Sequence, residues 1–442
     1  MARREPTAKR TADQVQTLAF TPEAHAALQR FEDTQQHVFL TGRAGTGKST
    51  LLQHFRATTT KRIVVLAPTG VAAVNVQGQT IHSFFRFGPG ITPDKARRRM
   101  RGTTQLYRHL RTIVIDEISM VRADLLDCID QFLRVNGPRA SAPFGGVQMI
   151  FIGDLYQLPP VVPPEEAGLF TTYYTSPFFF DAKVFEKVSC DVIQLTKVYR
   201  QDDATFVNLL DAVRTGALQP EQLAILNGRY RTDLSGLDRD QYVGLVTTNA
   251  MADRINAYHL ARLRQPPYTF RGRIEGTFQR SQLPTDDTLT LKAGGRIMML
   301  NNDPRGHWVN GTLGQIARID RRTDGTAVHV RLENGYTGRI LPYTWEAIRF
   351  VFDDRTQRIT SEVVGSFTQY PVRLAWGTTI HKAQGKTFDH VVIDFGHGTF
   401  APGQAYVALS RCRRLDGLVL RRPMQPEHVL IDHRVTAFLE RQ

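Results

Sequence analysis

A glycine-rich stretch near residue 45 has the spacing of a phosphate-binding loop. Gly42 and Gly47 are separated by four residues, and Lys48 and Ser49 follow directly. Glycines let backbone N–H groups curl around a phosphate, and the N-terminus of a following helix adds positive potential. The lysine would reach β- and γ-phosphates, and the serine hydroxyl would ligate magnesium. The loop residues predicted to contact a nucleotide are Gly42, Ala44, Gly45, Thr46, Gly47, Lys48, Ser49 and Thr50.

An acidic pair follows an apolar run in the stretch IVIDEISM. Asp116 ends the run, where its carboxylate can hold Mg²⁺ together with Ser49. Glu117 is next to it, where it can orient and deprotonate an attacking water. A kinase of small molecules would not need this second carboxylate. The pair therefore favours hydrolysis of ATP over phosphoryl transfer to a metabolite.

Three more polar residues are candidates for contact with a γ-phosphate. Gln157 lies in GDLYQLPPV, just past the end of an apolar run, on a loop held by two prolines. Arg200 in VYRQ and Arg411 in ALSRCR stand at expected strand or helix ends. Taken alone, each arginine is more simply read as a surface residue. If two lobes face each other across ATP, both could act as arginine fingers.

The elements that must position these residues read as α/β organisation. Near-continuous apolar runs at residues 62–68, 112–117 and 148–154 are typical of parallel strands buried on both faces, and helical patterns lie between them. The second half repeats this alternation without a second phosphate loop. The sequence therefore predicts two doubly wound parallel-sheet lobes.

Two stretches interrupt this pattern. Residues 266–365 carry short alternating runs and hairpin turn signals such as ENG, and predict a small antiparallel barrel inserted in the second lobe. Residues 88–111 are strongly basic and include Arg97, Arg98 and Tyr107. Basic residues around an aromatic ring suit a phosphate backbone and a base face, although a solvated basic helix is an equal alternative.

Composition limits the class of protein. The 442 residues carry a net charge of +14, which favours a polyanionic partner such as nucleic acid over a merely basic surface. Cys128, Cys190 and Cys412 are far apart, so neither a zinc site nor a disulfide framework is expected. No apolar run has the length of a membrane span, and the basic, polar residues 1–13 predict a flexible tail, not a secretory signal.

Taken together, the motifs resemble those of the Pif (petite integration frequency) family, in the B branch of superfamily-one helicases. The resemblance covers nearly the whole chain from about Leu18. It rests on TGRAGTGKST, APTGVAAVNVQGQTIHSFF, VIDEISM, PFGGVQMIFIGDLYQLPPV, LTKVYRQ, LVTTNAMADRIN, AWGTTIHKAQGKTFDHVVID and QAYVALSRCR, in the family's order. The PFGG segment ahead of GDLYQLPPV is especially similar to the region that separates this family from its RecD-like relatives.

The resemblance implies an ATP- and Mg²⁺-dependent motor that moves 5′-to-3′ on single-stranded DNA and unwinds duplex in replication, repair or recombination. Gln157 corresponds to a γ-phosphate sensor, Arg200 and Arg411 to arginine fingers, and Gly385 to a further ATP contact. The positions that correspond to DNA contacts are Pro68, Thr69, Gly70, Thr80, His82, Ser83, Phe84, Arg97, Arg98, Tyr107, Asn249, Thr379, His381 and Lys382.

The resemblance also divides the chain. The first RecA-like lobe is expected over 14–87 and 112–192, the wedge that would split duplex over 88–111, the second lobe over 193–265 and 366–442, and a Src-homology-three-like barrel over 266–365. The size favours a cytoplasmic enzyme of a bacterium or phage. We further expect a monomer in solution, with single-stranded DNA and single-strand/duplex junctions as its substrates.

One departure from the family pattern concerns adenine. Ala24 stands in FTPEAHAAL where the family has a glutamine that reads the base, which puts adenine selectivity in doubt. Three alternatives to an independent DNA helicase remain open from the residues: an ATP-gated nucleic-acid clamp that does not travel, a RecD-like subunit of a larger complex, and a motor on RNA. Phosphate contacts alone do not distinguish the sugar.

Overall fold

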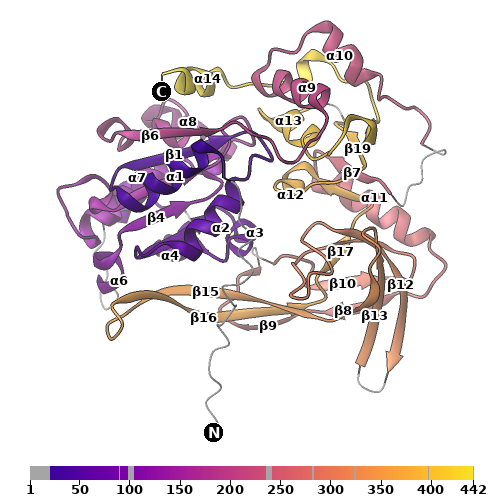
Figure 1. The fold of residues 1–442 in the computed structure, drawn as a ribbon. Helices are drawn as coiled ribbons and strands as arrows, with labels where there is room; N and C mark the ends of the chain where they lie inside the picture. Colours follow the sequence, from indigo (N-terminus) through magenta and orange to yellow (C-terminus); the bar gives the residue numbers. More distant parts are fainter. Residues whose placement is uncertain are drawn as a thin grey trace.

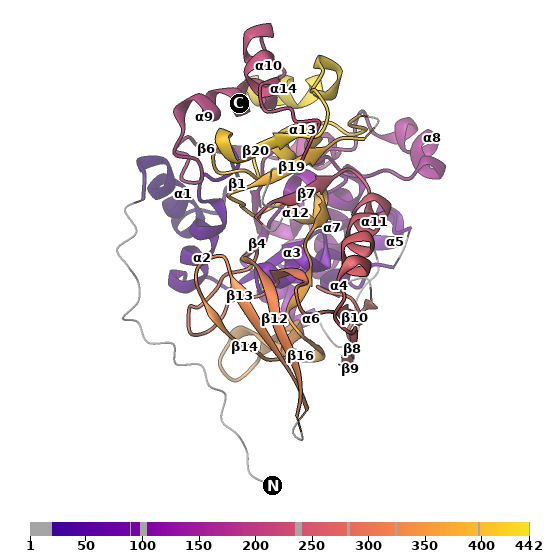
Figure 2. The same cartoon turned by 90° about the vertical axis from the view of Figure 1, so that its right-hand side faces the viewer.

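A computed structural model describes residues 20–88, 90–97, 104–234, 241–280, 283–322, 325–396 and 398–441. The predicted tail over 1–13 and Arg98 lie outside these residues. Two parallel-sheet lobes lie side by side, and a group of antiparallel strands lies at one end of the molecule, below both lobes in Figure 1 and again in Figure 2. Among the described residues, none of the helices combines the length and apolar character needed to cross a membrane.

The first lobe is built on a parallel sheet whose six described strands have the order β3-β2-β4-β5-β1-β6. Strands β4 and β5 are buried along their whole length, which explains their continuous apolar sequence. Strand β6 extends three residues past the boundary expected at 192. The strands are β1 (His37–Gly42), β2 (Ile63–Ala67), β3 (Gln79–Thr80), β4 (Thr112–Ile115), β5 (Gln148–Ile152) and β6 (Cys190–Leu195).

Helices cover both faces of this sheet. Side chains alternate along each strand, so Val38 and Leu40 of β1 pack with α1 and α2 while Phe39 packs on the opposite face with α4 and α7. The helices of this lobe are α1 (Pro22–Asp33), α2 (Lys48–Thr58), α3 (Gly70–Asn75), α4 (Ile81–Phe85), α5 (Pro93–Ala96), α6 (Thr104–His109), α7 (Ala123–Asn136) and α8 (Pro164–Tyr173).

The strand order brings three loops together. Strands β4, β5 and β1 are neighbours and run parallel, so their carboxyl ends lie at one edge of the sheet. The phosphate loop follows β1, the acidic pair follows β4, and the loop that carries Gln157 follows β5. Open parallel sheets bind ligands at this edge.

The second lobe has a parallel sheet of four described strands in the order β18-β7-β19-β20. Its strands are β7 (Val243–Val246), β18 (Gly377–Thr379), β19 (Val391–Asp394) and β20 (Leu418–Leu420), and its helices are α9 (Ala204–Thr215), α10 (Pro220–Asn227), α11 (Asn249–Arg262), α12 (Ile380–Ala383) and α13 (Gln404–Leu409).

The C-terminal helix α14 (His433–Glu440) contacts the first lobe, although it was expected in the second. The ring of Phe438 stacks on that of Phe180 at 4.3 Å, and Val435 belongs to the same apolar core as Phe39. Burial of these apolar side chains favours packing of α14 on the first lobe. The order of the segments in the sequence does not reveal this packing.

The inserted strands form three antiparallel sheets, ordered β14-β13-β12-β11-β17, β10-β8 and β15-β16-β9, and the described pairings do not close a ring. The insert extends past the expected end at 365, because β16 continues to Gln369 and β17 pairs with β11. The strands are β8 (Tyr268–Arg271), β9 (Arg273–Gly276), β10 (Thr288–Leu291), β11 (Arg296–Met299), β12 (Leu313–Arg322), β13 (Gly325–Leu332), β14 (Thr337–Ile340), β15 (Tyr343–Asp353), β16 (Arg358–Gln369) and β17 (Val372–Leu374).

The long β15–β16 hairpin reaches across to the first lobe (Figure 1). The ring of Phe350 lies 6.1 Å from that of Phe84 in α4, and the ring of Phe352 stacks on that of His109 at 3.9 Å. The backbone N–H of Phe350 donates to the side-chain oxygen of Gln79 at 3.3 Å. The insert therefore contacts the part of the first lobe that carries expected DNA-binding residues.

The described part of the basic segment 88–111 is anchored in the first-lobe core. Tyr107 in α6 is only 2% exposed and packs with Phe85 and Phe132, and its hydroxyl donates to the carbonyl of Phe84 at 2.8 Å. The prediction that Tyr107 presents its ring to a DNA base is therefore corrected. The ring stabilises the turn after α4 from within.

We expect Phe132→Ala to lower the free energy of unfolding by about 3–5 kcal/mol, because Phe132 is fully buried where α4, α6 and α7 meet. Urea unfolding followed by circular dichroism measures the change. The control is Phe400→Ala, at a phenylalanine that is 63% exposed. This control should change stability by less than about 0.5 kcal/mol. Equal effects of the two variants would contradict the assigned core.

Candidate active site

A cleft of about 530 Å³ lies where the two lobes meet. Of the residues predicted to contact ATP, every one except Gly42 lines it, and both members of the acidic pair do so as well. The lining comprises Ala44, Gly45, Thr46, Gly47, Lys48, Ser49, Thr50, Asp116, Glu117, Gly153, Gln157, Tyr199, Arg200, Asp202, Gly385, Thr387, Arg411 and Arg413.

The phosphate loop has the backbone conformation that its glycines allow. Gly45 has a φ of 83° and Gly47 a φ of 87°. Residues other than glycine rarely adopt this region. Helix α2 begins at Lys48, so its first N–H groups face the cleft. The Lys48 ammonium donates to the carbonyls of Gly42 and Arg43 at 2.7 and 3.0 Å. Burial lowers the pKa of Lys48, while the charges of Asp154 and Glu117 oppose this.

The carboxyl groups of Asp116 and Glu117 are in an environment that favours a bound cation or a bound proton. Burial, and then the adjacent charge of Glu117, raise the pKa of Asp116 to about 7. Burial also raises the pKa of Glu117, against Lys48 and Arg411. A Mg²⁺ ion near Ser49 and Asp116 would relieve this repulsion, so the residues fit the expected ion. In the described part of the chain, no group of three or more acidic, histidine or cysteine side chains could hold a metal ion.

The three predicted γ-phosphate residues reach the same cleft from different elements. The side-chain amide of Gln157 donates to Asp154 at 3.3 Å. Arg200, in the segment after β6, donates to the carbonyls of Ser410 and Gly385, each at 3.4 Å. Arg411 follows α13 and is 1% exposed. Burial, and then the like charge of Arg200, lower the pKa of Arg411, so an anion between the two guanidinium groups would be favourable.

Sequence reasoning missed Tyr199, which lines the cleft, and Gln384, which contacts the lining residue Glu117. The Gln384 side-chain amide donates to the Glu117 carboxylate at 3.0 Å, and Gln384 directly follows α12. Tyr199 is 52% exposed. The sequence held one clue to both residues, because Tyr199 directly precedes the predicted Arg200 and Gln384 directly precedes the predicted Gly385. Neither residue type is specific enough by itself to be selected.

The residues expected to contact DNA divide into exposed side chains and residues that shape the loops. Thr69, Thr80 and Thr379 cap short helices. Each of the three hydroxyls accepts a backbone N–H group at 3.2 Å. Thr80, Phe84, Tyr107 and Thr379 are buried, Pro68, Gly70 and His381 are partly exposed, and Thr69, His82, Ser83, Arg97, Asn249 and Lys382 are exposed.

Buried Phe84 and Tyr107 can influence DNA only through the loops they support. Phe400, an exposed residue that sequence reasoning missed, has its ring nearly parallel to that of His381, 6.5 Å away.

Ala24 does not supply a polar contact to the base. It is 6% exposed and packs in the core between α1 and the sheet. Any selectivity for adenine therefore has to come from residues other than Ala24.

Comparisons with known proteins identify the family of the chain. A family model described as PIF1-like helicase matches residues 21–223. An ATP-dependent DNA helicase Pif1 of Bdellovibrio bacteriovorus is 31% identical over 96% of this chain and 92% of its own. The chain belongs to the PIF1-like helicase family.

One further relative and two solved structures extend the comparison. Rat ATP-dependent DNA helicase PIF1 is 35% identical over 94% of this chain, which spans 63% of the length of that relative. A Bacteroides sp Pif1 solved with ADP-AlF4 has a TM-score of 0.86, with 35% identity over 95% of this chain and 96% of its own. A Bacteroides Pif1 bound to ssDNA has a TM-score of 0.68, again at 35% identity, over 95% and 96%.

We expect Gly45→Ala to weaken ATP binding about tenfold or more, because the added Cβ would collide with Arg200 in a strained backbone conformation. The Cβ would lie 2.4 Å from the Cβ of Arg200, at a backbone φ of +83°. Titration with a fluorescent ATP analogue measures the affinity. Gly335→Ala is the matched control, since its φ is +90° and nothing lies within 4 Å of the added Cβ. Unchanged affinity in Gly45→Ala would contradict the close approach.

The raised pKa of Asp116 predicts a pH-dependent cost to the nucleotide-free fold. Between the ordinary carboxyl pKa and about 7, Asp116 is ionised in the unfolded chain but keeps its proton in the folded chain. The folded state therefore binds more protons in this range, and its stability falls as the pH rises. We expect Asp116→Asn to remove that loss and to be more stable than the parent at pH 8 by on the order of 2 kcal/mol. Chemical unfolding at pH 5 and pH 8 tests this, and a destabilised variant at pH 8 would disprove it.

Proposed function

We propose that the chain hydrolyses ATP to move 5′-to-3′ along single-stranded DNA and to unwind the duplex ahead. The observation that carries this is the shared cleft, in which Lys48 and Glu117 of one lobe face Arg411 of the other. Such a site changes when the γ-phosphate is lost, and a change between two lobes can be converted into movement. The polarity comes from the family resemblance.

The residues divide the chemistry among them. Lys48 binds the β- and γ-phosphates, and Arg200 and Arg411 stabilise charge on the transferring group. Glu117, held by Gln384, accepts a proton from the attacking water. Ser49 and Asp116 would hold Mg²⁺, which supplies charge neutralisation when bound.

Contact between Gln384 and Glu117 suggests how DNA could stimulate hydrolysis. Gln384 directly follows α12, which carries His381 and Lys382 and is capped by Thr379. DNA on this helix would order Gln384 and, through its hydrogen bond, the catalytic carboxylate. A clamp that does not travel would have little need for such a link, so the motor is the better-supported function.

Single-stranded DNA and its junctions with duplex are the proposed substrates, with roles in replication, repair or recombination. The ssDNA-bound Bacteroides relative supports a DNA track, and the net charge of +14 agrees with a polyanionic partner. A monomer in the bacterial or phage cytoplasm is proposed as the acting form.

We expect ATP-dependent strand separation on a duplex with a 5′ single-stranded tail and none on the same duplex with a 3′ tail. Lys48→Ala should lose the activity, because the phosphates lose their cation. Gel separation of labelled strands measures both, and an RNA-tailed substrate tests the sugar. Tight, ATP-sensitive DNA binding without unwinding would instead indicate a clamp or a partner-dependent subunit.

A further inference from the structure

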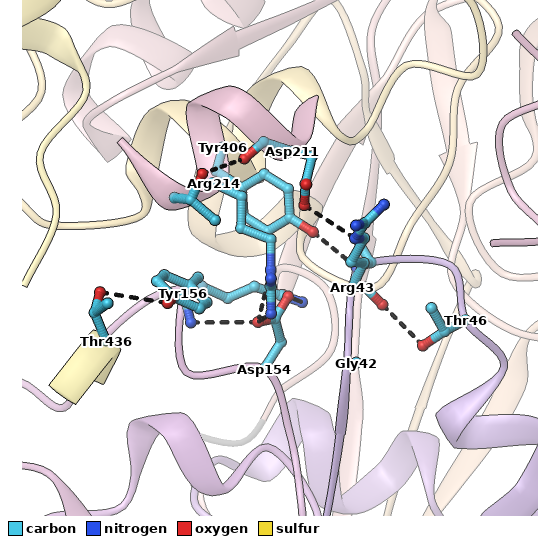
Figure 3. A network of polar contacts seen from close by, with 12 residues as sticks. Gly42, Arg43, Thr46, Asp154, Tyr156, Asp211, Arg214, Tyr406 and Thr436 are labelled. Atoms are coloured by element: carbon cyan, nitrogen blue, oxygen red, sulfur yellow. Dashed lines mark hydrogen bonds and ion pairs between the residues drawn. The ribbon is translucent and has the colours of Figure 1, made fainter. Parts of the chain in front are cut away.

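Helix α9 of the second lobe contacts two nucleotide-site loops through one face. Asp211 and Arg214 are three residues apart and therefore lie on the same side of the helix. Asp211 pairs with Arg43 of the phosphate loop at 3.0 Å, and Arg214 pairs with Asp154 of the loop after β5 at 3.1 Å. The two ion pairs have opposite polarity. Figure 3 shows both pairs beside the start of the phosphate loop.

Asp154 is the centre of this contact. Its side chain is fully buried, and that of Arg214 is 6% exposed. One carboxylate oxygen accepts from Arg214 and from the Tyr156 backbone N–H at 3.3 Å, and the other accepts from the Gln157 side-chain amide at 3.3 Å. The Arg214 guanidinium also lies 4.3 Å from the centre of the Tyr156 ring (Figure 3). Arg214 therefore reaches the predicted γ-phosphate sensor through a single carboxylate.

Charge balance gives this arrangement a consequence for ATP. Burial opposes ionisation of Asp154, but the charges of Arg214 and Lys48, with hydrogen bonds from Arg214 and Gln157, outweigh it and hold the pKa of Asp154 below its ordinary value. Lys48 thus has two possible anionic partners, Asp154 and the nucleotide phosphates. A buried carboxylate without its arginine would attract the Lys48 ammonium more strongly and compete with the nucleotide.

We propose that Arg214 is a positioning residue for ATP hydrolysis: through Asp154 it keeps Lys48 available to phosphate and orients Gln157. This rests on the proposed ATPase function. A second contact joins the same two lobes, because the backbone N–H of Ala44 donates to the Tyr406 hydroxyl of α13 at 2.8 Å (Figure 3). Through Arg214, Asp154 and Gln157, helix α9 links the γ-phosphate position to the second lobe.

Steady-state hydrolysis with single-stranded DNA tests the proposal in the full chain. In Arg214→Gln we expect the KM for ATP to rise about tenfold or more, because Asp154 is left uncompensated. In the double variant Arg214→Gln/Asp154→Asn, the KM should return most of the way to the parent value. Its kcat should be lower than that of the parent, since Gln157 has lost its charged acceptor. Arg214→Lys keeps the charge and should keep KM near the parent value.

The pH dependence separates this role from general damage to the fold. Without Arg214, protonation of Asp154 should release Lys48, so the KM of Arg214→Gln should improve from pH 8 to pH 6 more than that of the double variant. The other charged or titratable groups that act on Asp154 are Lys48, Glu117, Tyr406 and Arg411. All four are present in both variants, so the difference reports Asp154.

The matched control is Arg134→Gln, which removes an arginine from the 2.7 Å pair with Asp130 on α7, away from the cleft. It should change stability and leave KM unchanged. An unchanged KM in Arg214→Gln, or a loss that the double variant does not rescue at any pH, would overturn the proposal. If Arg214→Gln does not fold, Arg214→Lys with a raised KM would overturn it too. If Lys48→Ala retains hydrolysis, the proposed function fails instead.

Discussion

Opposite charges are buried together where the two lobes meet, and the arrangement around them follows from the need to balance those charges. The charges of Lys48 and Arg411 act on both Glu117 and Asp154, and Arg214 pairs with Asp154. Burial alone disfavours the charged form of each of these side chains. Removing one partner of a buried ion pair such as Arg214–Asp154 would leave the other charge uncompensated. A γ-phosphate adds negative charge at this point, so its arrival and loss change the balance for both lobes at once.

The charge balance requires that several loops reach one place, and the sheet topology provides this. Neighbouring parallel strands β4, β5 and β1 end at the same edge, and the loops after them carry Glu117, Gln157 and Lys48. The second lobe adds Arg411 after α13, Arg214 on α9 and Gln384 after α12. Helices α9, α12 and α13 therefore connect the cleft with different parts of the second lobe. One of them, α12, is the helix expected to contact DNA.

Contacts outside the cleft tie the parts of the molecule together. Helix α14 returns to the first lobe and stacks Phe438 on Phe180, and the β15–β16 hairpin places Phe352 on His109. The hairpin thereby joins the insert of the second lobe to the region around α4 and α6, whose aromatic core includes Tyr107. These apolar contacts cross between regions that the linear division of the chain would separate.

The sequence by itself determined the α/β class, the phosphate loop, the acidic pair and the family, because these depend on short spacings and on runs of apolar residues that read locally. It also predicted most of the residues that line the cleft, since motif order carries over between relatives. Only the tertiary structure decided which residues from distant segments meet: Gln384 with Glu117, Arg214 with Asp154, α14 with the first lobe, and Tyr107 inside the core. The physical reason is that such contacts are selected by burial and charge balance across the folded chain, and a single glutamine, arginine or tyrosine carries no mark in the sequence of the partner it will have.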